Sequence, residues 1–121
     1  MKLTQLTPML QVDDLKSTVD FYTAILDFVC DGYEPGWGWA SLHKDEVAIM
    51  LASPNQHLPY HNCFLTGSIY LRTDDAEGWW NKLKDKTEIV YPIESLEYGM
   101  REFAIRDCTG YIIQFGQAIN E

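Results

Sequence analysis

Apolar residues recur along this chain with two different periods, one typical of helices and one typical of strands. Two segments place apolar side chains at helical spacing: Leu15, Val19, Tyr22 and Leu26 in the first, and Ala76, Trp79, Trp80 and Leu83 in the second. Runs rich in β-branched and aromatic residues predict strands at residues 4–12, 27–33, 37–42, 46–52, 67–73, 88–92, 101–105 and 111–115. The pattern therefore predicts an α+β protein.

The predicted elements repeat, because strand, helix and three strands are followed by a linker and then by the same order again. Val12-Asp13-Asp14 and Thr73-Asp74-Asp75 stand at matching places in the two halves. Such a repeat indicates two βαβββ modules. We expect a single domain with a first module at about 4–52, a linker at 53–66 and a second module at about 67–117. Each module has one bare sheet face, and two such faces are buried by enclosing a common space.

The paired acids at the start of each helical segment are interpreted as helix caps, with acid–base catalysis as the alternative. A carboxylate at a helix N-terminus accepts hydrogen bonds from unpaired backbone N–H groups and meets the positive end of the helix dipole. Asp74, with Glu77 three residues later, has the spacing of a capping box.

The last two strands are predicted to form a β-hairpin. The connection between them contains Asp107, whose carboxylate can bond the downstream backbone, and Gly110, which adopts positive φ at little cost. In the first strand Pro8 lacks an N–H, so this strand is expected at a sheet edge or where pairing is interrupted.

The charge of the chain narrows the class of partner. Its 121 residues carry 18 acidic and 9 basic side chains, a formal net charge of −9. Such a chain repels nucleic-acid phosphates and favours cationic small molecules, although acidity that only supports solubility is the alternative. There is no apolar run long enough to span a membrane and no signal-peptide pattern at the start, so we expect a cytoplasmic protein.

The cysteines and histidines give no sign of a disulfide framework, a zinc site or a catalytic triad. The 3 cysteines, Cys30, Cys63 and Cys108, are odd in number and widely spaced, so they are interpreted as free thiols. His57 and His61 flank a proline in a predicted loop and His43 lies in a predicted turn, so all three are interpreted as exposed polar residues.

Several aromatic residues are candidates for ligand binding. Trp37 and Trp39 alternate with glycine, which is expected to put both indoles on one strand face, next to Tyr33. Tyr70 in the second module, and Tyr98 and Met100 at the start of the last hairpin, are further candidates. Ordinary packing is the alternative for the two tryptophans. By contrast, Trp79 and Trp80 follow the helical stripe and are interpreted as core.

The closing hairpin carries a recognisable pattern: Tyr98-Gly99, then Arg101-Glu102-Phe103, then Arg106-Asp107 and Gly110. This pattern resembles the closing hairpin of the bleomycin resistance proteins, members of the vicinal oxygen chelate group with glyoxalase I and the extradiol dioxygenases. Together with the double βαβββ order, the resemblance covers nearly the whole chain and implies the glyoxalase-like half-barrel fold. Cys108 stands where that family usually has proline, and Gly32 falls near a position where it can place an aromatic residue.

The resemblance also locates the positions at which the enzymes of the group hold a divalent metal. In this chain those positions are Thr7, Met50, Ser68 and Gln114. Hydroxyl and thioether groups are poor ligands for Mg²⁺, Mn²⁺ or Zn²⁺, and the Gln114 carbonyl alone will not hold a divalent ion. We therefore expect no metal and no cofactor.

The resemblance implies a homodimer that sequesters a planar, cationic drug without chemistry, with the Pro8 strand exchanged between partners and each groove built from both chains. Asp31 matches the acid that contacts the drug, Trp37 an aromatic contact, and Tyr98 the residue before the closing motif. The favoured hypothesis is a metal-free protein that binds a small molecule through residues Asp31, Tyr33, Trp37, Trp39, Tyr70, Tyr98 and Met100. The alternatives are a glyoxalase- or dioxygenase-like lyase or oxidoreductase with an atypical metal site, and a dimeric module with a filled cavity that acts through other proteins.

Overall fold

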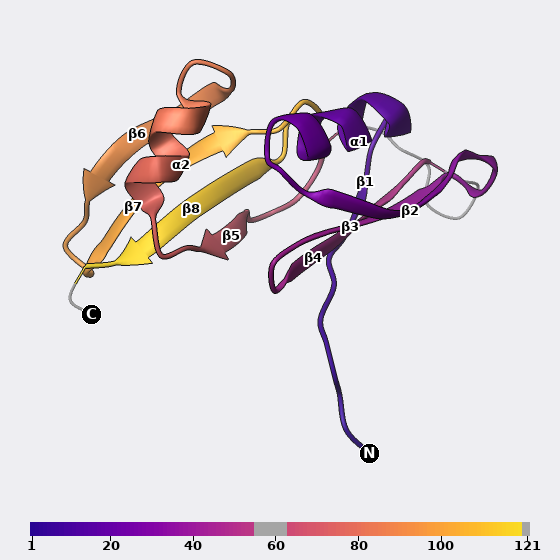
Figure 1. Ribbon diagram of the computed structural model, residues 1–121, viewed down its shortest axis with the longest axis horizontal. Helices are drawn as coiled ribbons and strands as arrows, with labels where there is room; N and C mark the ends of the chain where they lie inside the picture. Colours follow the sequence, from indigo (N-terminus) through magenta and orange to yellow (C-terminus); the bar gives the residue numbers. More distant parts are fainter. Residues whose placement is uncertain (55–62, 120–121) are drawn as a thin grey trace. The chain divides into compact units, whose positions relative to one another are not determined.

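The helices and strands follow the predicted order of two βαβββ modules, which confirms the α+β fold class (Figure 1). The computed structural model describes residues 1–54 and 63–119. The chain divides into two compact units, Met1–Cys63 and Phe64–Glu121. Part of the predicted linker, with His57 and His61, lies outside the described residues.

The first unit is a four-stranded sheet with one helix on it. Its elements are β1 (Met9–Gln11), α1 (Leu15–Ala24), β2 (Val29–Glu34), the short 3₁₀ helix η1 (Pro35–Trp37), β3 (Trp39–Lys44) and β4 (Val47–Ala52). The strand order is β1-β4-β3-β2, with β1 parallel to β4 and the other pairs antiparallel. The edge position of β1 agrees with the expectation from Pro8, whose carbonyl accepts a hydrogen bond from the Met50 N–H.

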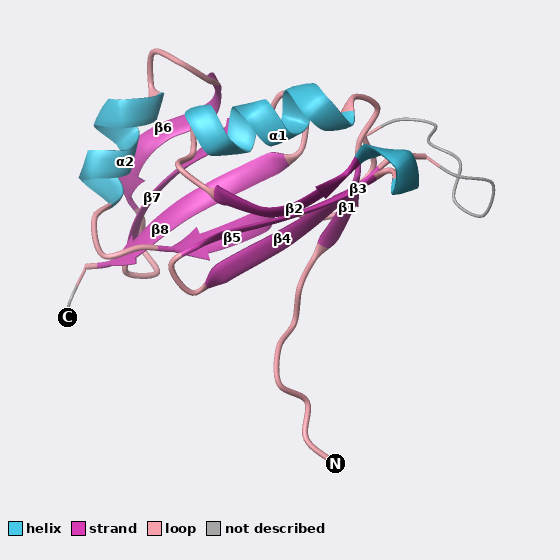
Figure 2. Ribbon diagram, turned by 45° about the vertical axis from the view of Figure 1, so that its right-hand side comes forward, coloured by secondary structure: helices cyan, strands magenta, loops and turns pink. Residues whose placement is uncertain are grey.

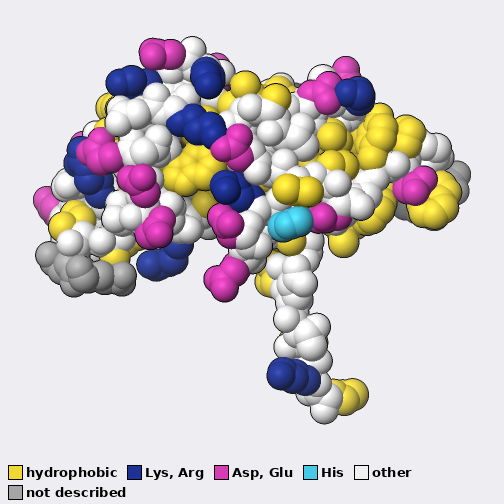
Figure 3. Space-filling model, viewed as in Figure 1, with side chains coloured by type: hydrophobic (Ala, Val, Ile, Leu, Met, Phe, Trp, Pro, Cys, Tyr) yellow, Lys and Arg dark blue, Asp and Glu magenta, His cyan; other side chains and the backbone are white. Residues whose placement is uncertain are grey.

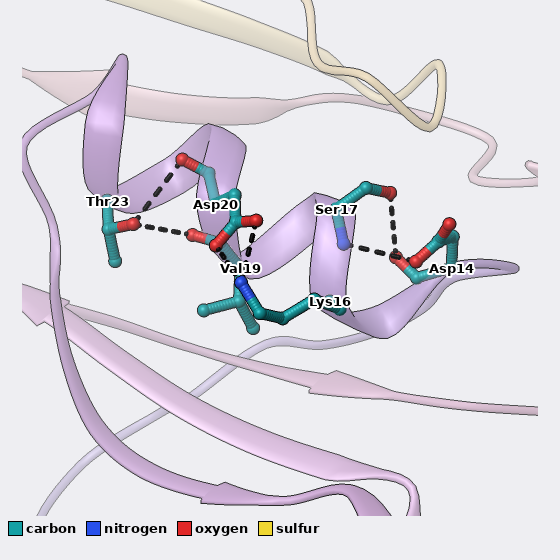
Figure 4. A network of polar contacts seen from close by, with 6 residues as sticks. All are labelled: Asp14, Lys16, Ser17, Val19, Asp20 and Thr23. Carbon is teal, nitrogen blue, oxygen red and sulfur yellow. Dashed lines mark hydrogen bonds and ion pairs between the residues drawn. The ribbon is translucent and has the colours of Figure 1, made fainter.

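Helix α1 begins at the second acid of the Asp13-Asp14 pair. The Asp14 carboxylate accepts a hydrogen bond of 3.1 Å from the Ser17 N–H, as an N-cap residue does. On the exposed face, Lys16 and Asp20 form an i, i+4 ion pair (Figure 4). Four side chains of the opposite face are buried: Leu15, Thr18, Val19 and Tyr22.

The second unit repeats this arrangement with longer final strands. Its elements are β5 (Ile69–Arg72), α2 (Ala76–Leu83), β6 (Glu88–Ser95), β7 (Met100–Arg106) and β8 (Ile112–Ala118). The strand order is β5-β8-β7-β6, with β5 parallel to β8. In each unit the helix lies over one face of that unit's own strands (Figure 2).

An aromatic core joins α2 to its sheet. Trp79 packs on Phe115 with ring centroids 5.1 Å apart, and Trp80 packs edge-on against Phe103 at 5.3 Å. Phe103 and Phe115 stack on each other from β7 and β8. Both tryptophans are half-buried, so the helical stripe packs them against the core rings of β7 and β8 without burying them completely.

The turn of the closing hairpin is held by one carboxylate. Asp107 is 5% exposed, and its Oδ1 accepts hydrogen bonds from the backbone N–H groups of Thr109, Gly110 and Tyr111. Gly110 has φ 117°. Both roles were predicted from the sequence, because an Asp that bonds its downstream backbone and a glycine with positive φ close a tight connection.

The structure corrects two local predictions. The capping box at Asp74 and Glu77 is wrong, because the N-cap is Asp75, which accepts from Gly78, while Glu77 pairs with Arg101. Strand β6 also continues to Ser95, beyond the strand predicted at 88–92, because it pairs with β7 as far as Arg101. Within the described part of the chain no helix is long and apolar enough to cross a membrane.

Candidate functional site

The two faces of the second unit's sheet differ sharply in character. Since Phe103 and Phe115 point toward α2, strand alternation places Glu102 and Gln114 on the opposite face. Tyr70 lies beside Gln114 in the β5–β8 pair. Tyr91 of β6 lies beside Ala104, on the same face as its neighbour Gln114.

A buried carboxylate lies at the centre of this face. Glu102 is only 1% exposed, the deepest acid among the described residues. Its side chain accepts hydrogen bonds from the Tyr70 hydroxyl at 2.9 Å, from the Tyr91 hydroxyl, and from Gln114 Nε2 at 3.3 Å. The Tyr98 hydroxyl interacts with the same carboxylate. These donors compensate for the lost hydration of the buried charge.

The balance of burial and hydrogen bonding keeps Glu102 ionised. Burial raises the pKa of Glu102, but the hydrogen bonds from Tyr91, Tyr98, Tyr70 and Gln114 together outweigh it and hold the pKa below the usual value. The carboxylate is therefore negative at neutral pH even though it is shielded from water.

The pKa values of the tyrosines are raised, whereas that of Glu102 is lowered, so the phenols keep their protons. Burial, followed by the hydrogen bond to Glu102, raises the pKa of Tyr70 to about 12. The same causes in the same order raise the pKa of Tyr91. The hydrogen bond to Glu102 also raises the pKa of the exposed Tyr98. All three phenols are thus neutral donors to the carboxylate.

Two further polar residues extend the network. Gln114 Nε2 also donates to the Tyr91 hydroxyl at 2.8 Å, and the Ser68 hydroxyl donates to Gln114 Oε1. We refer to these residues as the tyrosine–glutamate cluster: Ser68, Tyr70, Tyr91, Tyr98, Glu102 and Gln114.

The cluster requires a glycine at position 116. Gly116 lies between Glu102 and Arg72 in the sheet. A Cβ atom at Gly116 would overlap the Tyr70 ring and its hydroxyl. Glycine at this position therefore leaves the room through which Tyr70 reaches Glu102.

In the first unit the predicted ligand contact Asp31 is already paired. Its Oδ2 lies 2.6 Å from Nδ1 of His43, and both side chains are about half exposed. The β2–β3 register shifts between Cys30 and Gly32, which makes Asp31 the extra residue of a bulge. The Trp39 ring lies over the open space at Gly32, 3.1 Å from where a Cβ would stand.

The other aromatic candidates of the first unit do not share one face. Trp37 ends η1 and is 80% exposed, and Gly38 at φ 65° separates it from Trp39, where β3 begins. The expectation that both indoles lie on one strand face is therefore wrong. Tyr33 pairs with the buried Ala40, so it lies on the face of α1, opposite Trp39. Figure 3 shows hydrophobic side chains gathered near the β2–β3 connection.

The remaining candidates lie in the second unit, together with two that sequence reasoning missed. Tyr70 and Tyr98 belong to the cluster, and Met100 lies two residues before Glu102, on the same strand face. Tyr91 and Glu102 were not predicted. A single acid within the apolar run of β7 was the available signal, because a charge in a buried strand needs dedicated partners.

The four metal-ligand positions do not suit a divalent ion. Gln114 Oε1 accepts from Ser68, and the Thr7 hydroxyl accepts from Gln5. Met50 offers only a thioether, which suits soft ions. Within residues 1–54 and 63–119 there is no group of three His, Cys, Asp or Glu that could hold a metal. The donor chemistry at these positions therefore does not fit the metal of the glyoxalase-like enzymes.

Comparison with protein families decides the class of this chain. Residues 3–115 match the family model described as the Glyoxalase/Bleomycin resistance protein/Dioxygenase superfamily. The chain belongs to this superfamily. Comparison with curated proteins gives no matching relative. The description of this superfamily covers enzymes as well as resistance proteins.

Several solved structures share the fold of this chain at low sequence identity. TioX from Micromonospora sp. ML1 has a TM-score of 0.78 at 18% identity, over 95% of this chain and 98% of that one. Lactoylglutathione lyase from Agrobacterium tumefaciens has a TM-score of 0.75 at 18% identity, over 94% and 92%. The bleomycin-binding protein from Streptomyces verticillus, complexed with copper(II)-bleomycin, has a TM-score of 0.72 at 19% identity, over 95% and 96%.

Proposed function

We propose that this superfamily member captures a planar, cationic small molecule without transforming it. The observation that carries the proposal is the tyrosine–glutamate cluster, in which an ionised carboxylate lies beneath tyrosine rings on one sheet face. Its shifted groups are unsuited to proton transfer, because the pKa of Glu102 is lowered while that of Tyr70 is raised to about 12. A general acid or base works best with a pKa near the operating pH.

The exposed rings provide the contact surface for such a ligand. Tyr98 is 67% exposed and Tyr70 is 38% exposed. Aromatic rings stack on a planar ligand, and a cation over such a ring contributes about 0.5–2 kcal/mol, depending on desolvation. The negative charge of Glu102 beneath the rings adds to this attraction.

The proposal includes the remaining features expected from the bleomycin resistance proteins. Asp31, Trp37 and Trp39 are proposed contacts from the first unit, Tyr33 is left out because it lies on the α1 face, and Met100 flanks the cluster. The protein acts as a cytoplasmic homodimer whose first strand is exchanged between partners. The similarity to the bleomycin-binding protein from Streptomyces verticillus supports this proposal.

Calorimetry with bleomycin, with and without copper(II), tests the capture function. We expect binding by the unchanged protein and a loss of about tenfold in affinity, or ~1.4 kcal/mol, for Tyr98→Ala, Trp37→Ala and Asp31→Ala. Glu88→Gln is the control, because Glu88 is an exposed carboxylate paired with Arg106. Affinity that is unaffected by all three substitutions excludes these residues from the site, and no binding of either form overturns capture of this drug class.

A lyase or oxidoreductase with an atypical metal site is the second candidate, supported by the similarity to lactoylglutathione lyase. It predicts about one divalent ion per chain after incubation with Zn²⁺, Ni²⁺ or Mn²⁺, with turnover that follows metal content. Elemental analysis after dialysis, paired with a lactoylglutathione assay, separates this candidate from capture. Stoichiometric metal with turnover would reverse the order of the two proposals.

A further inference from the structure

We propose that the tyrosine–glutamate cluster selects ligands by the direction of their hydrogen bonds, taking amidines, guanidines and amines and disfavouring carboxylates. The inference rests on the proposed function, since it names the ligand chemistry of the same site. It follows from where each hydrogen atom of the cluster points.

The phenolic hydrogens are already used within the protein. A tyrosine hydroxyl has one hydrogen to donate and lone pairs that accept. Tyr70 and Tyr91 donate theirs to the Glu102 carboxylate, and the Tyr98 hydroxyl interacts with the same group. Because these phenols hold their protons firmly, they continue to donate inward across the neutral pH range.

The hydrogens of the neighbouring amide and hydroxyl are used as well. Gln114 Nε2 has two hydrogens, one of which goes to the Tyr91 oxygen and the other to Glu102. The Ser68 hydroxyl donates to Gln114 Oε1. A carboxylate has about four acceptor positions, and Glu102 receives four partners. The cluster therefore presents a ligand with lone pairs of phenol and hydroxyl oxygens, and with no spare side-chain hydrogen.

Charge favours the same ligands as hydrogen-bond direction does. Glu102 is negative, and Glu94 adds negative potential near Tyr98. Arg72 acts in the opposite sense on Tyr70. Arg101 is tied to Glu77 by a hydrogen bond of 2.7 Å from its Nε. A carboxylate placed over the cluster would face lone pairs above a buried negative charge, whereas an amidinium would donate to those lone pairs and be attracted by the charge.

Benzamidine and benzoate form the test pair, because both are a planar ring with a planar substituent, and the two differ in charge and hydrogen-bond direction. We expect the unchanged protein to bind benzamidine at least about tenfold more tightly than benzoate. Titration followed by NMR signals of the Tyr70, Tyr91 and Tyr98 rings reports both affinity and location. A ratio near unity, a preference for benzoate through Arg72, or no shift with either probe overturns the proposal.

Glu102→Gln tests the mechanism of the preference. The new amide donates a hydrogen to a phenol oxygen, so that phenol can turn its own hydrogen outward. We expect the benzamidine-to-benzoate affinity ratio to fall by about tenfold or more. Glu88→Gln makes the same chemical change on the exposed end of β6 and is expected to leave the ratio unchanged. An unchanged ratio in Glu102→Gln overturns the proposal.

Tyr70→Phe covers the case in which Glu102→Gln does not fold. It removes one accepting oxygen and leaves the carboxylate in place. We expect weaker benzamidine binding by about threefold to tenfold and unchanged benzoate binding. Circular dichroism verifies that each variant is folded. Equal effects of Tyr70→Phe on both probes contradict selection by hydrogen-bond direction.

The two proposals fail in distinguishable ways. Bleomycin binding that is sensitive to Tyr98→Ala, together with a preference for benzoate, leaves capture standing and removes only the donor selectivity. A clear preference for benzamidine at the cluster, with no binding of bleomycin, supports donor selectivity and removes capture of that drug class.

Discussion

At the scale of single residues, the most demanding position is Glu102. Burying an unpaired carboxylate costs several kcal/mol, and the compensation here comes from phenol and amide donors rather than from a cationic partner. Gly116 supports the arrangement by leaving room for Tyr70. The cluster thus keeps a negative charge beneath tyrosine side chains and shielded from bulk water.

The lowered pKa of Glu102 predicts a specific dependence of stability on pH. Its pKa in the folded protein lies below the ordinary 4.5 that applies when unfolded, so its stabilising contribution is present above that pH and is lost as pH falls through the folded value. Glu102→Gln should lower the unfolding free energy by roughly 1–3 kcal/mol at pH 7. The gap between the two proteins should narrow below about pH 4.5.

Urea unfolding at a series of pH values measures this gap, with Glu88→Gln as the matched control. A difference in unfolding free energy that stays constant from neutral to acid pH would show that ionisation of Glu102 does not stabilise the fold.

At the scale of elements, each helix starts at the second acid of its pair. Asp14 accepts from Ser17, and Asp75 accepts from Gly78. A residue of β8 fixes the start of α2 as well, because Gln117 accepts from the Ala76 N–H and donates to the Asp74 carbonyl. The N-terminus of α2 is therefore held both by its own cap and by the sheet.

The two acids before α2 should differ in their contribution to stability. Asp75→Ala removes the side-chain cap and should cost about 1 kcal/mol of unfolding free energy. Asp74→Ala keeps the backbone carbonyl that Gln117 uses, so it should cost a few tenths of a kcal/mol. Thermal or urea unfolding of both variants decides between them, and an equal loss would contradict the assignment of Asp75 as the cap.

At the scale of the whole molecule, the dominant property is a formal net charge of −9 over 121 residues. Long-range attraction of cations follows from such a charge and is screened by salt. Short-range contacts with the cluster are screened much less. Salt therefore separates the contribution of the overall charge from that of the site.

Benzamidine binding should weaken by about threefold to tenfold when ionic strength rises from about 0.01 M to about 1 M, since the Debye length falls from about 30 Å to about 3 Å. Neutral benzamide, which has nearly the same shape, should bind with little dependence on salt. Calorimetry over this range provides the comparison. A benzamidine affinity independent of salt would limit electrostatic attraction to direct contacts.

The amino-acid sequence by itself determined the local features of this protein. The βαβββ order follows from the spacing of apolar residues, and the turn at Asp107 and Gly110 follows from side-chain chemistry within a few residues. These two predictions are correct because a helix period or a turn depends on residues that are close together in the chain.

Only the tertiary structure decided which distant residues meet. Glu102 is buried among tyrosines brought by β5 and β6, and this depends on the register between strands rather than on any local pattern. The 3₁₀ turn before Gly38 separated Trp37 from Trp39, although their alternation alone predicted one shared face. Strand pairing and backbone turns therefore decide which side chains come into contact. Side-chain direction reverses at every residue of a strand, so a single irregular residue moves a side chain to the other face.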